Sequence, residues 1–222
     1  MADATVDAAR TEILRRVRSA LAGAPGAAPR RGEAPQLTVR EPLQQRLARF
    51  EEVLSRVGGH VHRVRDERAA AQTLARLVDE IDARDVALSD DALVRALAAR
   101  LPSGARCFDG WSDRERLFAC GLGLTSAQAA IAETGTLVLE SRAERHRLVS
   151  LVPPVHVAVL RAGSVRSGLD EVLAELAGSG GPCPAVTLIT GPSRTADIEL
   201  ELVVGVHGPR ALHVVVLEEP NA

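Results

Sequence analysis

Residues 60–89 decide the fold class, because they predict a strand, a helix and a second strand in succession: His60-Val61-His62-Arg63-Val64, a helical face of Leu74, Leu77, Val78 and Ile81, and Asp85-Val86-Ala87-Leu88-Ser89. Asp66 stands where it can cap the helix. A further helix is expected over 90–100, and a further strand over 105–108. Short strands that alternate with helices are typical of βαβ crossovers and a parallel sheet.

The chain on either side of this stretch extends the same pattern. A preceding amphipathic helix is expected from Leu43 to Val57, ended by Gly58-Gly59. Strands are expected at 117–125, 136–140, 155–160, 185–190 and 211–217, and a helix at 169–177 with Ser167 as its N-cap. Val214 to Leu217 is apolar on both faces, as central parallel strands are.

The first forty residues predict a separate part. Val6, Ile13 and Val17 recur at helical spacing, and residues 22–35 are rich in Ala, Gly and Pro, which is typical of a linker. We therefore expect an N-terminal helix and linker over 1–40 and an α/β domain over 41–222. The helix is expected either to pack on a partner or on the domain, or to be a solvated arm.

Composition excludes several function classes. The net charge of −2 gives no electrostatic basis for binding nucleic acid, no segment has the length of a membrane span, and residues 1–18 lack the apolar core of a signal peptide. We expect a cytoplasmic protein. All 27 basic side chains are arginine, which excludes a lysine Schiff base and a P-loop lysine. Cys107, Cys120 and Cys183 lie far apart, so no iron–sulfur cluster and no metal site are expected, and a cofactor is not identified.

The turn Gly191-Pro192-Ser193-Arg194-Thr195-Ala196-Asp197-Ile198-Glu199 is a candidate anion site. It follows the apolar run 185–190, which predicts a buried strand, and ligands in parallel α/β sheets sit at the carboxyl ends of strands. Glycine lets the backbone approach a ligand, hydroxyls donate hydrogen bonds, and the guanidinium suits a carboxylate or phosphate. The alternative is a capped turn, with Ser193, Thr195 or Asp197 as the N-cap of a following helix.

Other candidate residues lie in three more segments. Glu133, at the start of an apolar strand, can be a base, a nucleophile or a ligand for a substrate hydroxyl, or it can be a paired structural carboxylate. His207 in a glycine-rich turn can face a pocket. His156 is expected to be a packed histidine bonded to a loop carbonyl. The basic cluster Arg142, Arg145, His146 and Arg147 can hold an anion or form a solvated charged face. The resulting candidates are Glu133 as a catalytic residue and Thr134, Gly135, Thr136, Gly191, Ser193, Arg194, Thr195, Asp197 and His207 as ligand-binding residues.

Four segments occur in an order that resembles the lactate utilization protein C family, built on the LUD domain: residues 132–139 (Ala-Glu-Thr-Gly-Thr-Leu-Val-Leu), 153–159 (Pro-Pro-Val-His-Val-Ala-Val), 191–199 and 205–210 (Gly-Val-His-Gly-Pro-Arg). The resemblance implies a Rossmann-like three-layer α/β/α fold with a mostly parallel sheet, similar to ribose-5-phosphate isomerase and CoA transferases. An N-terminal helical arm is added to it here.

The resemblance also implies a role: a non-redox subunit that supports oxidation of L-lactate to pyruvate together with iron–sulfur partner subunits. On this reading the chain binds a small anionic ligand, and self-association is left open. The alternative is a stand-alone enzyme, transferase- or isomerase-like, that acts on a phosphorylated or carboxylated metabolite with Glu133 as base or nucleophile. A regulatory ligand-binding module is a third reading. CoA transferases use a glutamate nucleophile, but fold similarity does not transfer that role to Glu133.

Overall fold

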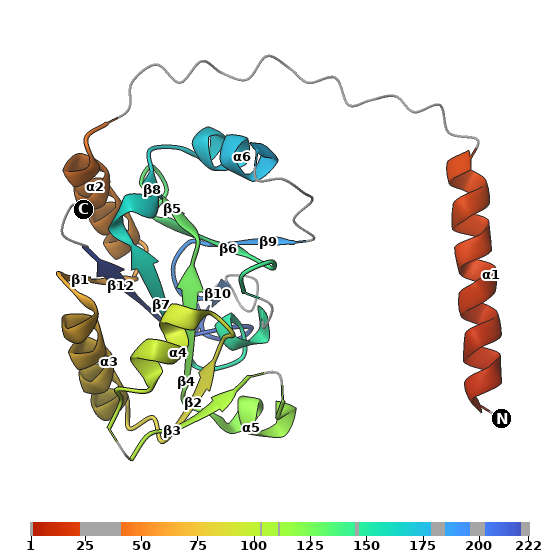
Figure 1. Ribbon diagram of the computed structural model, residues 1–222, viewed down its shortest axis with the longest axis horizontal. Helices are drawn as coiled ribbons and strands as arrows, with labels where there is room; N and C mark the ends of the chain where they lie inside the picture. The colour runs from red at the N-terminus through yellow and green to blue at the C-terminus, as the bar shows by residue number, and fades with distance from the viewer. Residues whose placement is uncertain are drawn as a thin grey trace. The chain divides into compact units, whose positions relative to one another are not determined.

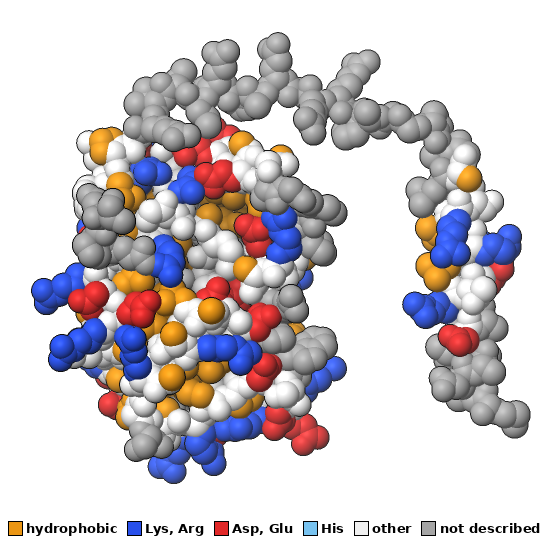
Figure 2. Space-filling model, in the orientation of Figure 1, with side chains coloured by type: hydrophobic (Ala, Val, Ile, Leu, Met, Phe, Trp, Pro, Cys, Tyr) orange, Lys and Arg blue, Asp and Glu red, His pale blue; other side chains and the backbone are white. Residues whose placement is uncertain are grey.

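A computed structural model describes residues 2–22, 41–102, 104–110, 112–144, 147–178, 185–195 and 203–218. Contacts divide the chain into two units, Met1–Gln36 and Leu37–Ala222. The first contains α1 (Ala2–Ala22), in which Ile13 and Val17 are exposed and Glu12 pairs with Arg15 and Arg16. Hydrophobic atoms lie beside arginine side chains on its surface (Figure 2).

The second unit is built on a six-stranded sheet in which every neighbouring pair is parallel. Its strand order is β1 (His60–Val64), β12 (Ala211–Leu217), β7 (Val155–Arg161), β4 (Leu122–Ala127), β2 (Asp85–Leu88) and β3 (Arg106–Asp109). The adjacent strands β12, β7 and β4 are almost wholly buried, as is typical of interior strands in a parallel sheet. The α/β class and the mostly parallel sheet expected from the sequence are therefore confirmed.

One face of this sheet is covered by α3 (Glu67–Ile81) and α4 (Ala92–Ala98) (Figure 1). The carboxylates of Asp66 and Asp91 accept hydrogen bonds from the first free amides of these helices, so both helices begin where a cap is available. Leu74 and Leu77 of α3 pack in one cluster with buried residues of β2, β4, β7 and β12.

The opposite face is covered by α2 (Leu43–Arg56) and by a second, mixed sheet. The second sheet has the order β8 (Val165–Arg166), β5 (Ala129–Ile131), β6 (Thr136–Glu140) and β9 (Val186–Ile189), with β5–β6 and β6–β9 antiparallel. The helix α6 (Leu169–Gly178) packs Val172 on β5 and β6. This outer layer thus combines helices with the strands of a second sheet.

Shorter elements complete the unit: α5 (Arg114–Ala119), the 3-10 turns η1 (Arg147–Ser150) and η2 (Ala162–Ser164), and the antiparallel pair β10 (Arg194–Thr195) and β11 (Val203–Val204). On the face seen in Figure 2, arginine and acidic side chains are intermixed. No helix among the described residues combines the length and the apolar character needed to cross a membrane.

Two expected strands differ in the structure. The strand predicted over 117–125 begins only at Leu122, because Asp113 caps α5 and Leu117 is buried as part of that helix. The run 185–190 is not a buried central strand: β9 pairs only with β6 among the described strands, and its side chains alternate, leaving Leu188 50% exposed. An apolar run of this length does not by itself distinguish a buried strand from an edge strand.

Candidate functional site

Two of the predicted turns meet at the C-terminal end of α2. Gly135 has φ of 64°, and a Cβ there would lie 2.6 Å from the backbone nitrogen of Leu54. Gly191 has φ of 87°, and a Cβ there would lie 3.0 Å from the carbonyl oxygen of Val57. Both glycines are therefore required by positive φ and by close approach to the helix. A hydroxyl chain joins the turns, with Thr136 Oγ1 2.7 Å from both Thr134 Oγ1 and Thr190 Oγ1.

Arg194 is also used at this helix end. Its Nη2 donates to the Val57 carbonyl oxygen at 2.7 Å, which satisfies a carbonyl that the last turn of α2 leaves without an intrahelical donor. Thr195 pairs with Val203 between β10 and β11, so Ser193 does not start a helix and that form of the capped-turn alternative is wrong. Asp197 lies outside the described residues.

The Gly191 turn forms one wall of a crevice of about 310 Å³. The other walls come from the loops before β7 and β12, because Ser193 N donates to Pro209 O and Arg210 N donates to Pro154 O, each at 2.8 Å. The crevice is lined by Arg147, Ser150, Leu151, His156, Thr187, Leu188, Ile189, Thr190, Gly191, Pro192, Ser193, His207, Gly208, Pro209 and Leu212. Three of the four sequence motifs thus meet around one space.

The crevice lies at a different edge of the sheet from the one expected. His156 and Leu212 are the second residues of their strands, so they mark the amino ends of β7 and β12. The Gly191 turn follows β9, which belongs to the second sheet. The rule that ligands sit at carboxyl ends of parallel strands therefore does not place this turn.

Glu133 is exposed and lies outside the lining of the crevice. Its backbone nitrogen donates to Ser167 O at 3.1 Å, and a Cβ at Gly168 would lie 3.5 Å from its Oε2. Of the ten predicted site residues, Gly191, Ser193 and His207 line the crevice, while Thr134, Gly135, Thr136 and Arg194 gather behind it at the end of α2.

His156 is a packed histidine, as the sequence suggested, but its partner is a side chain. It is 1% exposed, and its Nε2 lies 2.9 Å from Thr125 Oγ1, while Nδ1 has no partner among the described residues. Burial lowers the pKa of His156 to about 3, so the imidazole that contributes to the crevice is neutral at physiological pH.

Glu144 is a buried carboxylate that sequence reasoning missed. It is 3% exposed, and its Oε1 accepts hydrogen bonds from Ser126 N and Ser126 Oγ at 2.6 Å and from Ser89 Oγ at 3.0 Å. Its Oε2 has no partner among the described residues. Burial raises the pKa of Glu144 to about 7, against the opposing effect of the serine donors. The sequence around it, Arg142 to Arg147, gives no signal of burial.

A small cavity of about 10 Å³ lies beside Glu144. It is lined by Thr125, Leu139, Ser141, Glu144, Arg147, Ser150, Ala185 and Thr187, and it shares Arg147, Ser150 and Thr187 with the crevice. A volume of this size has room for about one water-sized group. Arg147 therefore lines both the crevice and the small cavity that Glu144 lines.

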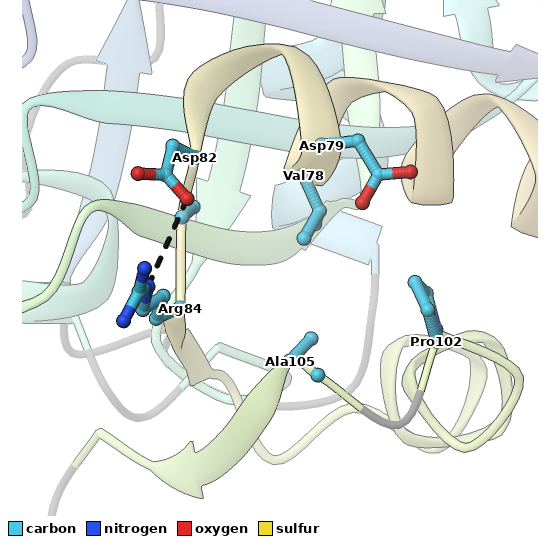
Figure 3. A pocket seen from close by; sticks show the side chains of 8 residues that line it. Val78, Asp79, Asp82, Arg84, Pro102 and Ala105 are labelled. Carbon is cyan, nitrogen blue, oxygen red and sulfur yellow. Dashed lines mark ion pairs between the residues drawn. The ribbon is translucent and has the colours of Figure 1, made fainter.

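A larger groove of about 440 Å³ lies at the C-terminal end of α3 (Figure 3). It is lined by Val78, Asp79, Asp82, Ala83, Arg84, Pro102, Gly104 and Ala105. Figure 3 shows Arg84 directed at Asp82, and the two are 3.8 Å apart. The side chains of Arg84 and Asp82 are 79% and 85% exposed, so both charges are solvated and weakly coupled. A further groove, lined in part by Ser126, Gln128 and Arg161, opens at the carboxyl ends of β4 and β7.

The described residues include no cluster of three His, Cys, Asp or Glu side chains arranged to hold a metal ion. The thiols of Cys107 and Cys120 are partly or wholly buried, and burial raises the pKa of each. Because the thiolate is the metal-binding form, both thiols are poor ligands as they stand.

Comparison with known proteins gives consistent matches. The sequence model of the LUD domain matches residues 47–217. A lactate utilization protein C of an Exiguobacterium species is 32% identical over 157 residues, which is 66% of this chain and 67% of that protein. A lactate utilization protein C of Halalkalibacterium halodurans is 43% identical over 100 residues, 43% of this chain and 44% of that protein.

Among solved structures, a DUF162 family protein from Deinococcus radiodurans is similar with a TM-score of 0.60 and 24% identity, covering 80% of this chain and 99% of that one. This likeness supports the fold alone. The alignments span about two thirds of the Exiguobacterium protein and less than half of the Halalkalibacterium protein.

Proposed function

This chain belongs to the LUD domain family, and we propose that it acts in lactate utilization as a non-redox subunit, supporting oxidation of L-lactate to pyruvate with iron–sulfur partner proteins. The observation that carries the proposal is the family match over most of the α/β unit, together with relatives named lactate utilization protein C. The proposal places the protein in the cytoplasm, where such partners would meet it.

The division of labour is supported by the cysteine environment. Iron–sulfur clusters are held by thiolates that converge on one site. Cys107 lies on β3 and Cys120 follows α5, where its Sγ contacts the Leu117 carbonyl oxygen at 3.2 Å. Burial favours the protonated form of these two thiols, which supports leaving electron transfer to the partner proteins. Cys183 lies outside the described residues.

A small anion is the ligand that best fits the crevice. Arg147 supplies a permanent positive charge, Ser193 and Thr190 supply hydroxyl donors, and His207 supplies an imidazole. No acidic side chain lines this crevice among the described residues. The volume of about 310 Å³ is at the lower end of the range for small-molecule pockets, which suits a short organic acid.

The stand-alone enzyme reading receives less support from this geometry. A catalytic carboxylate has to reach the same ligand as the anion-binding groups. Glu133 lies beside Gly168 on the surface and does not line the crevice, and Arg194 is bonded to the end of α2. We therefore rank the subunit role first.

Growth on L-lactate tests the proposed function. A strain that lacks this chain is expected to grow poorly on L-lactate as carbon source and normally on glucose, and the wild-type chain should restore growth. Arg147→Gln should restore growth poorly, whereas Arg84→Gln, which changes an exposed arginine of the distant groove, should restore it fully. Normal growth of the deletion strain on L-lactate, with no iron–sulfur protein recovered by affinity purification, would refute the proposal.

A further inference from the structure

Two buried polar atoms near the crevice lack partners among the described residues: Glu144 Oε2 and His156 Nδ1. Burying a polar atom without a hydrogen bond destabilises the fold, so a buried polar atom of this kind is a candidate for binding a ligand or a water molecule. Glu144 is the more informative of the two, because its other oxygen is held by three donors while Oε2 is left free. The serines thus fix the carboxyl group in one orientation.

Arg147 stands on the other side of the same small cavity. It begins η1, whose turn is closed by a 2.9 Å hydrogen bond from Ser150 Oγ to the Arg147 carbonyl oxygen. The side chain is exposed, lines both the small cavity and the crevice, and has no ion pair within the described part of the chain. Arg142, by contrast, pairs with Glu140 at 2.8 Å. The cation at the mouth of the cavity is therefore available to a ligand.

Resting on the anion-binding role proposed above, we propose that Arg147 and Glu144 form a proton-coupled carboxylate site. A small monocarboxylate binds to the Arg147 guanidinium in the crevice, and Glu144 takes up one proton from solvent as it binds. The protonated Glu144 then donates a hydrogen bond from Oε2 across the water-sized cavity toward the ligand. The only bond change in this step is the proton transfer: an O–H bond forms on Glu144 and one breaks in hydronium or the buffer acid.

The electrostatic reason is the repulsion between two carboxylates at short range. A carboxylate at Arg147 brings a second negative charge close to Glu144 in a poorly solvated place, which favours the protonated form of Glu144. Asp91, at the start of α4, acts in the same direction, and the pKa of Glu144 is already raised to about 7 by burial. His156 stays neutral behind Thr125, so it does not supply the proton. His207 is the other titratable group that lines the crevice.

Calorimetry on the full chain tests the coupling. L-lactate and pyruvate are titrated at pH 6, 7 and 8 in buffers of different ionisation enthalpy, which counts the protons taken up, with lactamide and inorganic phosphate as the neutral and the non-carboxylate probes. We expect about half a proton taken up at pH 7 and more at pH 8, with affinity falling up to tenfold per pH unit above pH 7. Binding without proton uptake, or equal binding of lactamide or phosphate, would overturn the proposal.

Three substitutions assign the proton and the anion. Glu144→Gln keeps the acceptor for the two serines, and it should bind lactate or pyruvate with no proton uptake and with pH-independent affinity. His207→Gln should still take up the proton, and Arg147→Gln should lose affinity at least tenfold where Arg84→Gln does not. Proton uptake that persists in Glu144→Gln and disappears in His207→Gln would refute the role of Glu144.

The test separates this inference from the proposed function. If Glu144→Gln does not fold, the wild-type proton count and the exposed Arg147→Gln variant still decide the matter. Rescue of growth on L-lactate without proton-coupled binding would refute the inference and leave the subunit role intact. Proton-coupled binding without a growth defect in the deletion strain would refute the subunit role and leave the inference intact.

Discussion

Replacing Glu144 with glutamine should change how the stability of the protein depends on pH. Burial raises the pKa of Glu144 from 4.5 to about 7 in the folded state. A group with a raised folded pKa binds more protons when folded, so its contribution to stability is fully present below pH 4.5 and is lost as the pH rises to about 7. Glutamine does not titrate, so the variant lacks this loss.

The magnitude follows from the two pKa values. Each pH unit between 4.5 and about 7 is worth about 1.4 kcal/mol, so the wild type should lose about 3 kcal/mol relative to Glu144→Gln across this range. The glutamine Nε2 occupies the place of the unpartnered Oε2, which costs the variant about 1–3 kcal/mol at every pH. Only the pH-dependent part of the difference in free energy of unfolding therefore reports on ionisation of the Glu144 carboxyl group.

Urea unfolding followed by circular dichroism at pH 5, 6, 7 and 8 measures this difference. The free energy of unfolding of Glu144→Gln minus that of the wild type should rise steadily up to pH 7 and then level off. Glu115→Gln, which changes an exposed glutamate of α5, is the matched control for removing a carboxylate. A difference for Glu144→Gln that is constant with pH would show that this carboxyl group is not desolvated, and the reasoning about the cavity would fail.

Three further predictions concern the fold around the site. Burial and two neighbouring histidines lower the pKa of His213 to about 4. The contribution of His213 to stability is therefore complete above pH 6.5 and is lost as the pH falls toward 4. In urea unfolding, the free energy of unfolding of His213→Gln should decrease less over this pH range than that of the wild type. Gly135→Ala should lower the free energy of unfolding by about 2–4 kcal/mol, because φ is positive and the new Cβ meets the backbone of α2, whereas Gly163→Ala, with no atom within 4 Å of its Cβ, should change it by less than about 1 kcal/mol. Asp66→Ala removes the cap of α3 and should cost about 1 kcal/mol, and Asp66→Asn should recover most of it in the same assay.

The strands and helices of the main sheet could be predicted from the sequence, because apolar runs and capping residues are local patterns. Val214 to Leu217 is apolar on both sides and lies in an interior strand of the sheet, and Asp66 caps the helix it precedes. Leu117 shows the limit of such patterns, since its buried position fits a short helix as well as a strand. The edge position of β9 depends on pairing with β6, which no local pattern encodes.

The candidate site was predicted in part for the same reason. Gly191, Ser193 and His207 belong to turns, and turn residues carry a readable signal of glycine and hydroxyl side chains. Glu144 follows a charged segment that looks solvated, and its burial arises only when Ser89 and Ser126 are brought together by the parallel strands. Arg194 has the chemistry to bind an anion, but in the fold its Nη2 donates a hydrogen bond to the Val57 carbonyl oxygen at the end of α2.

Two separate loops pack against the C-terminal end of α2. The Thr134–Thr136 turn rests on Leu54 and the Gly191 turn rests on Val57, and these two residues are three positions apart on one rigid helix. A substitution that shifts the end of α2 should therefore move both loops together, including the Gly191 turn that lines the crevice.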